Sequence, residues 1–435
     1  MNPGIILLSF GMLASLAVLG VPIAYAFIAT AVLGTLLSIG SVDAALTLLS
    51  QTVFSDVREY TFVVLPMFTA MGTIIAYSGA ARDVFVSADR SFARVRGRLA
   101  VATIAGNAMF AAVTGVGIAA AAAFSRIAYP QMTDLGYKRS FAAGCIAGSS
   151  VLGLLIPPSV FMIIWAILTE QSVGRLFVAG VAPGLILTFL YMLYVVIRVT
   201  LNPTLAPDRP EDEVPPPREP GAAFSLFGIL FLIVTVLGGI WFGLMTPTEA
   251  SAIGLLVSMI FGWIKGMRLK EFTAALMEAG RLVTPLILLL IAAKMFSRFL
   301  ALEGVPDLVA WTLEDTGFGP TGTILLMCAV WLVLGMLIDS VLIMLLTVPI
   351  FYPISQSLGM DPIAFALVGI LVIEAGVLTP PFGLAAFVVK GAIDDPAITI
   401  REVFEGSAPY AAMILVVALL VGVFPAIATF LPSLM

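Results

Sequence analysis

The sequence predicts an all-α polytopic membrane protein built from two repeats of opposite membrane topology. Hydrophobic residues make up 61% of the 435 residues and charged residues 11%, whereas a soluble domain carries roughly 25% charged residues. The mean hydropathy is +1.13, and the apolar residues gather into long runs that recur after an offset of 223 residues. Most of the chain is therefore expected to lie in lipid, with its backbone polar groups satisfied inside helices.

Ten of the apolar runs are interpreted as membrane spans, for which about 20 apolar residues suffice. The other two, 99–125 and 319–351, are interpreted as re-entrant hairpins. In chain order, the runs lie at residues 4–20, 22–40, 60–79, 99–125, 140–168, 176–200, 223–243, 250–265, 282–301, 319–351, 362–391 and 408–432. Each half is thus predicted to contain five spans and one hairpin.

A proline-rich segment divides the chain into two comparable halves. Residues 202–222 carry seven prolines among acidic residues, and proline cannot continue a regular helix. We therefore predict a cytoplasmic linker between a first repeat at 1–201 and a second at 223–435. Without any gap, the offset aligns Pro130 with Pro353, Leu135–Gly136 with Leu358–Gly359, Gly153 with Gly376, Leu155 with Leu378, and Pro157–Pro158 with Pro380–Pro381.

The distribution of lysine and arginine, which favour the cytoplasmic side of a membrane, orients the two hairpins. Both ends of the run 99–125 are basic, with Arg82, Arg90, Arg94, Arg96 and Arg98 before it and Arg126, Lys138 and Arg139 after it. This run is therefore predicted to enter from the inner face, with its tip at Thr114–Gly117. The run 319–351 lies in a stretch without lysine or arginine between Arg298 and Lys390, so it is predicted to enter from the outer face. Opposed elements of this kind are typical of inverted-repeat secondary transporters.

Two spans, 140–168 and 362–391, carry a double proline in mid-membrane. Proline removes a donor and clashes with the preceding turn, so both helices should unwind, at Gly153–Ser159 and at Gly376–Gly383. A single double proline could simply kink its helix. Its occurrence at matching positions in the two repeats instead favours unwound segments that bind ions or substrate. The hairpin tips add further helix ends, at Thr114–Gly117 and Gly335–Ser340.

Asp339 is the leading candidate for a cation ligand, because a lone carboxylate in the membrane costs about 3 kcal/mol and needs a cation or a partner. Glu374 follows the same logic, although it could pair with a neighbouring donor instead. The first half offers neutral hydroxyl oxygens, namely those of Thr114, Ser149, Ser150 and Ser159. Such oxygens suit a hard monovalent cation; the alternative is that these hydroxyls serve only in the packing of helices. We further predict substrate contacts from Pro158, Ser159, Ser340, Pro380, Pro381 and Gly383.

The composition also argues against other classes of protein. Histidine is absent, which removes the usual ligands of haem and of zinc within a membrane. The net charge of -5 and the lack of a basic stretch with aromatic residues argue against nucleic acid as a partner. Cys145 and Cys328 lie in apolar runs, where packing is their expected role. No catalytic residue and no organic cofactor are predicted, and a membrane enzyme or assembly subunit is a remote alternative.

Several stretches together resemble the large membrane subunit of the tripartite ATP-independent periplasmic (TRAP) transporters, and the similarity runs through nearly the whole chain. The stretches are Pro130 with Gly136–Tyr137, Gly148–Ser150 leading into Leu152–Ser159, Leu176–Phe177 to Pro183–Gly184, Thr246–Ala250, Gly335 with Asp339, and Thr379–Gly383. Each is weak alone, but together they are specific to this family.

The resemblance implies a sodium-driven elevator with ion-transporter-superfamily architecture in the bacterial inner membrane. Its substrate would be a small organic anion, such as a carboxylate or sialic acid, delivered by a soluble periplasmic binding protein. A small four-helix membrane subunit would complete the complex. Sodium ions, the only metal expected, would bind at Thr114, Gly115, Ser149, Ser150 and Pro157 on one side and at Gly335, Asp339, Gly376 and Thr379 on the other. The alternative is a stand-alone sodium-coupled anion symporter that needs no binding protein.

Overall fold

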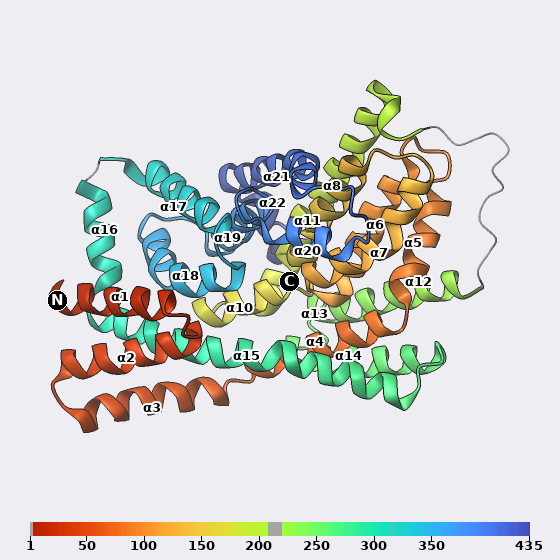
Figure 1. Cartoon of the computed structure of the whole chain (residues 1–435). Coiled ribbons are helices and arrows are strands. Elements are labelled where there is room, and N and C mark those ends of the chain that lie inside the picture. Colours follow the sequence, from red (N-terminus) through yellow and green to blue (C-terminus); the bar gives the residue numbers. More distant parts are fainter. Residues whose placement is uncertain (1–2, 208–219, 316) are drawn as a thin grey trace.

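The computed structural model describes residues 3–207, 220–315 and 317–435, and these residues form helices and no strand (Figure 1). Six described helices are long and apolar enough to cross a membrane, and the number rises to eight if two bent helix pairs each count as one span. Further apolar helices of 10–17 residues accompany them. The prediction of an all-α polytopic membrane protein is confirmed.

The described part of the first half contains eleven α-helices and a short 3₁₀ helix. They are α1 (Pro3–Val18), α2 (Ile23–Ile39), α3 (Val42–Arg58), α4 (Thr61–Tyr77), α5 (Ala80–Ser91), α6 (Arg98–Thr114), α7 (Gly117–Asp134), α8 (Arg139–Ser150), α9 (Leu152–Leu155), α10 (Val160–Thr169), α11 (Val173–Leu201) and η1 (Pro203–Leu205). The apolar runs did not include α3, because this helix is amphipathic. Its apolar residues lie on one face and its polar residues on the opposite face, so the average hydropathy of the segment is low. Most of the predicted linker, 202–222, lies outside the described residues.

The described part of the second half contains eleven α-helices, a π-helical segment and a short 3₁₀ helix. It contains α12 (Pro220–Ile233), the π-helical η2 (Val234–Gly238), α13 (Gly239–Trp241), α14 (Pro247–Ile264), α15 (Leu269–Leu302), α16 (Val305–Asp315), α17 (Gly319–Gly335), α18 (Ser340–Ser357), α19 (Pro362–Val377), α20 (Leu384–Ala392), α21 (Ile400–Val423), α22 (Ala426–Thr429) and η3 (Pro432–Leu434). The apolar runs missed α16 and gave only the second part of α15, whose 34 residues begin well before residue 282.

One side of the molecule is built on α15, which packs along α2, α3 and α4, while α14 also packs on α4 (Figure 1). Phe299 of α15 approaches α2 closely, because a Cβ at Gly34 would lie 2.5 Å from the Phe299 ring. A largely buried ion pair between Asp83 and Lys265 joins α5 to the end of α14, and the hydroxyl of Ser225 in α12 donates to the same carboxylate. These contacts hold α5 against α12 and α14.

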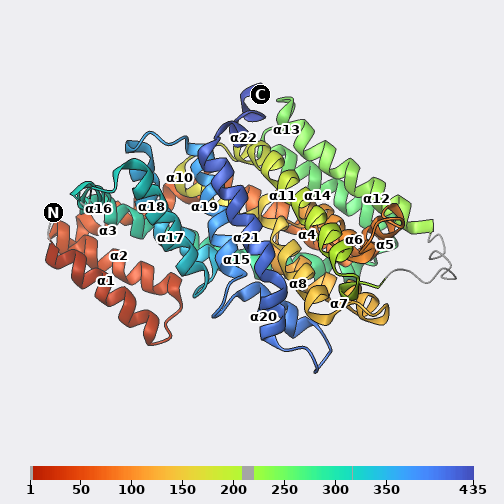
Figure 2. The same ribbon diagram turned by 90° about the horizontal axis from the view of Figure 1, so that it is seen from above.

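The other side is organised by α21, which lies between α8 and α19 (Figure 2). Glycines permit this close packing: a Cβ at Gly144 would lie 2.1 Å from the carbonyl carbon of Gly406, and one at Gly148 would lie 2.2 Å from the Tyr410 ring. Small residues four positions apart are the usual means by which membrane helices approach closely. The α8–α21 contact therefore ties the first half to the second.

Gly144→Ala is expected to destabilise this contact, since overpacking a tight interior costs about 1–3 kcal/mol. The measurement is the melting temperature of the purified protein in detergent, which should fall. Gly280→Ala is the matched control, because Gly280 also lies within a helix but has no atom within 4 Å of its Cβ position. An equal melting temperature for the two variants would contradict this role of Gly144.

Candidate functional site

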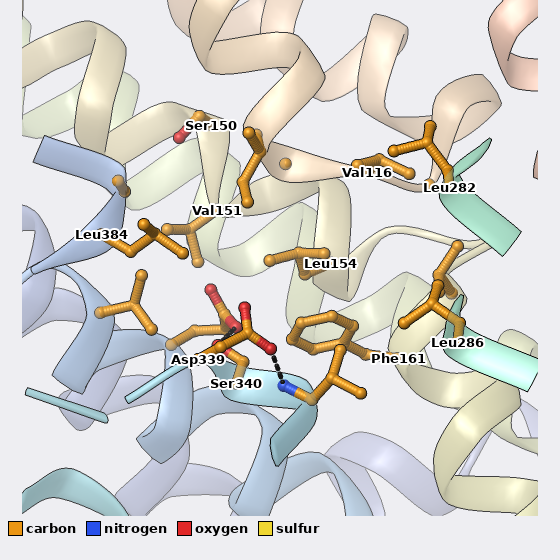
Figure 3. A pocket seen from close by; sticks show the side chains of 18 of the residues that line it. Val116, Ser150, Val151, Leu154, Phe161, Leu282, Leu286, Asp339, Ser340 and Leu384 are labelled. Carbon is orange, nitrogen blue, oxygen red and sulfur yellow. Dashed lines mark hydrogen bonds between the residues drawn. The ribbon is translucent and has the colours of Figure 1, made fainter. Parts of the chain in front are cut away.

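A cavity of about 230 Å³ lies where helix ends from both halves converge (Figure 3). The connection between α6 and α7 and the break between α8 and α10 form one part of its wall, and the first turn of α18 with the ends of α19 and α20 forms another. Thr69 of α4 and Leu282, Pro285 and Leu286 of α15 close it from the α15 side. The cavity thus lies between α4 and α15 on one side and four breaks on the other. Two of these are the hairpin connections, α6–α7 and α17–α18, and two are the breaks in the broken helices, α8–α10 and α19–α20.

Among the described residues, two carboxylates line the cavity and no lysine or arginine does. Asp339 begins α18 as its N-cap and accepts a hydrogen bond of 2.9 Å from the backbone N–H of Val341. The hydroxyl of Ser340 donates to Glu374 at 2.8 Å, and the Glu374 side chain is almost fully buried. In Figure 3, Asp339 and Ser340 lie across the cavity from Ser150 and Val116. The wall is therefore acidic on the side of the second half.

The connection between α6 and α7 is seated on the first broken helix. A Cβ at Gly115 would lie 2.5 Å from the carbonyl oxygen of Pro158, and one at Gly117 would lie 2.8 Å from that of Ser150. Gly115 also has φ +63°, a left-handed conformation that favours glycine. The structure thus brings Gly115 together with the break that contains Pro157, whereas the Thr114 hydroxyl donates to the carbonyl of Phe110 in its own helix at 3.1 Å.

The second hairpin connection meets the second broken helix in a similar way. A Cβ at Gly335 would lie 2.7 Å from the carbonyl oxygen of Ile373, and one at Gly376 would lie 2.7 Å from the Cα of Gly335. Beyond the break, the backbone N–H of Phe382 donates to the carbonyl of Met336 at 3.1 Å. Gly335, Gly376 and Asp339 therefore belong to one compact region, and their role at a cation site stays a prediction.

Three of the hydroxyls predicted as sodium ligands, two from the first side and Thr379 from the other, donate to backbone carbonyls three or four residues earlier in the chain. Ser149 donates to the carbonyl of Cys145 at 2.7 Å, Ser150 to that of Ala147 at 2.8 Å, and Thr379 to that of Ala375 at 2.7 Å. Ser150 lines the cavity, whereas Ser149 faces α6 and accepts a hydrogen bond of 2.6 Å from the Nδ2 of Asn107.

Sequence reasoning missed Asn107, which is fully buried and whose Oδ1 makes no hydrogen bond within the described part of the chain. A lone amide in an apolar run was the available signal. The apolar lining from α15 gave no signal at all, because its approach to the cavity depends on tertiary packing.

The residues predicted to contact substrate occupy different environments. Ser340 lines the cavity, and the carbonyl of Pro158 lies against Gly115. Ser159 is buried as the N-cap of α10, where its hydroxyl donates to the carbonyl of Leu154 and accepts from the N–H of Met162. Pro380 and Pro381 are exposed, and Gly383 lies against Phe404. Their contact with substrate stays a prediction.

Residues 10–427 match the sequence profile of the family described as "Tripartite ATP-independent periplasmic transporter, DctM component". The C4-dicarboxylate TRAP transporter large permease protein DctM of Pseudomonas aeruginosa is 34% identical over 390 residues, which cover 88% of this chain and 89% of that protein. The ectoine TRAP transporter large permease protein TeaC of Halomonas elongata is 27% identical, with 96% of this chain and 97% of that protein covered.

The fold also has a solved counterpart. The crystal structure of the YdaH transporter of Alcanivorax borkumensis superimposes with a TM-score of 0.63 at 16% identity, covering 89% of this chain and 90% of that one. The chain forms a bundle of apolar helices around an internal cavity, and its relatives are named transporter permeases. It is therefore a membrane transporter rather than an enzyme. The chain belongs to the DctM family, the large permease component of the tripartite ATP-independent periplasmic transporters, and is a multi-pass protein of the bacterial inner membrane.

Proposed function

We propose that this chain carries out sodium-coupled uptake of a small organic anion by an elevator mechanism. The observation that carries the proposal is the cavity wall, where the part of the chain that the structure describes places Asp339 and Glu374 and no lysine or arginine. Two carboxylates at membrane depth repel an anionic substrate unless cations neutralise them. Sodium bound beside Asp339 would both satisfy the carboxylate and make the cavity attractive to an anion.

The arrangement of the cavity supports a moving unit that carries the substrate. One wall consists of both hairpin connections and both broken helices, and the facing wall consists of α4 and α15. We propose that the hairpins and broken helices move together past α4 and α15, with the two halves as inverted repeats. Helix starts agree with the 223-residue offset, since α7 begins at Gly117 and α18 at Ser340.

The driving force is sufficient for accumulation. Each sodium ion that enters down a tenfold gradient releases about 1.4 kcal/mol, and one net charge that crosses 100 mV releases about 2.3 kcal/mol. Two sodium ions with a monoanion therefore release about 5 kcal/mol, enough for more than a thousandfold accumulation. With a dianion such as a C4-dicarboxylate no net charge crosses, and the two sodium ions release about 3 kcal/mol, enough for about a hundredfold accumulation.

We also propose that the chain works with a small four-helix membrane subunit and a periplasmic binding protein that delivers the substrate. A carboxylate is the preferred substrate class, because the similar DctM protein is named for C4-dicarboxylates; a sialic-acid-like anion is the second. The family description itself names a tripartite transporter.

Uptake by the reconstituted complex tests this function. Proteoliposomes that hold this chain and its small partner should accumulate the labelled C4-dicarboxylate succinate, or else sialic acid, only with sodium outside and the binding protein present. Potassium in place of sodium should abolish accumulation. Uptake without the binding protein would instead support a stand-alone symporter, and uptake that ignores sodium would overturn the proposed coupling.

A further inference from the structure

The wall of the cavity is mostly apolar, although the proposed substrate is an anion. Apolar side chains come from both walls, and they include Val116, Leu154, Phe161, Leu282, Leu286 and Leu384. In Figure 3, Leu154 and Phe161 lie between Asp339 and the two leucines of α15. A bound molecule therefore contacts carbon atoms over most of its surface.

The polar side chains of the wall already have hydrogen-bond partners. Among the described residues they are Thr69, Ser150, Asp339, Ser340 and Glu374. Each of the three hydroxyls donates to an acceptor of the protein, at 2.8 Å in every case. The two carboxylates, when ionised, can only accept hydrogen bonds. In the described part of the wall, no side chain therefore has a donor left for a substrate.

Backbone N–H groups at two helix starts are the donors that remain. The N-cap residues of α7 and α20, Val116 and Gly383, make no side-chain hydrogen bond to the first turn. Gly117 and Leu384, the first residues of these helices, line the cavity. Unpaired N–H groups at a helix start attract an anion. The carboxylate of a substrate can therefore bind here without a lysine or arginine.

A second carboxylate on the substrate would meet unfavourable surroundings. Asp339 and Glu374 already place two negative charges on the wall, which the two sodium ions of the proposed mechanism would balance. A dianion then adds two charges where a monoanion adds one, and the burial of a charge without a partner is costly. An apolar group in place of the second carboxylate instead gains from contact with the apolar wall.

We propose that the cavity selects a small monocarboxylate with an apolar body, such as a branched aliphatic acid, over a dicarboxylate of the same shape. The inference rests on the proposed transport function, because it takes the cavity as the substrate site with sodium bound. The carboxylate binds at a helix start, and the apolar body packs against Phe161 and Leu286. Succinate binds the same site more weakly. The hydroxyl groups of a sialic acid also bind less well, because they exchange water for few partners.

A pair of acids tests this selection. In 4-methylpentanoate an isopropyl group replaces one carboxylate of succinate, and the two acids are otherwise the same. Titration calorimetry on the purified full chain in sodium chloride measures the dissociation constant of each acid. We expect the dissociation constant of 4-methylpentanoate to be about a hundredfold lower, because the isopropyl group is buried favourably and the second carboxylate is not.

Leu286→Ser tests whether the apolar wall is the cause. It should raise the dissociation constant of 4-methylpentanoate about tenfold, because the isopropyl group loses an apolar contact, and it should leave that of succinate unchanged. Leu289→Ser is the matched control, since Leu289 is also a partly buried leucine of α15 but is not among the lining residues. It should leave the binding of both acids unchanged.

The outcomes separate this inference from the proposed function. Equal dissociation constants for the two acids, tighter binding of succinate, or equal effects of Leu286→Ser and Leu289→Ser would overturn the inference and leave sodium-coupled transport of an anion intact. Binding of neither acid would remove the cavity as the substrate site, which would overturn the inference and the proposed function together.

Discussion

Asp339→Asn is expected to abolish sodium-driven uptake while the protein stays folded. Asparagine caps a helix as well as aspartate does, so the hydrogen bond to the N–H of Val341 and the start of α18 should persist. Only the negative charge is lost. Removal of one partner from a buried charge pair costs about 3 kcal/mol or more, which corresponds to at least a hundredfold weaker cation binding. The measurement is the initial rate of uptake against sodium concentration.

The matched control is Asp361→Asn. Asp361 caps α19 by accepting hydrogen bonds of 2.9 Å from the N–H groups of Ile363 and Ala364, but it does not line the cavity. This variant should keep the sodium dependence of the unmodified protein. If Asp339→Asn retained full uptake with an unchanged sodium requirement, the coupling site would have to lie elsewhere.

Gly115→Ala is expected to reduce uptake at least tenfold, because it displaces the first hairpin tip. An alanine in the left-handed conformation costs about 1–2 kcal/mol. Its Cβ would also lie 2.5 Å from the carbonyl oxygen of Pro158, and such overpacking adds about 1–3 kcal/mol. The tip must therefore shift away from the broken helix, which changes the cavity that Gly115 lines. The initial rate of uptake at equal protein content measures the effect.

Gly40→Ala separates the two causes. Gly40 ends α2 as Gly115 ends α6, with φ +73°, but no atom lies within 4 Å of its Cβ position. It should share only the conformational cost and keep most of the uptake. Similar losses in both variants would mean that the contact with Pro158 is unimportant.

The sequence predicted most of the elements that surround the cavity, because the strongest local signals lie there. The double prolines mark the observed breaks, since α9 ends at Leu155 before α10 begins at Val160, and α19 ends at Val377 before α20 begins at Leu384. The glycines of the first tip also stand where α6 ends. Proline and glycine act through local sterics, so such breaks can be predicted without tertiary structure.

Other features could not be predicted, because they arise from tertiary contacts or amphipathic patterns. α3 and α16 are too polar for a hydropathy average to detect. The cavity wall from Thr69 and Leu286, and the contact of Asn107 with Ser149, join segments that are distant in sequence. Ser159 carries a hydroxyl that could bind a ligand, yet this hydroxyl caps the N-terminus of α10.

Sodium binding itself tests the central claim most directly, because it requires neither a substrate nor a partner. The melting temperature of the purified chain should rise with sodium chloride but not with potassium chloride at equal ionic strength, since a ligand that binds only the folded state stabilises it. The rise should vanish in Asp339→Asn and persist in Asp361→Asn. Equal effects of the two salts, or a rise that survives in Asp339→Asn, would contradict a sodium site at this carboxylate.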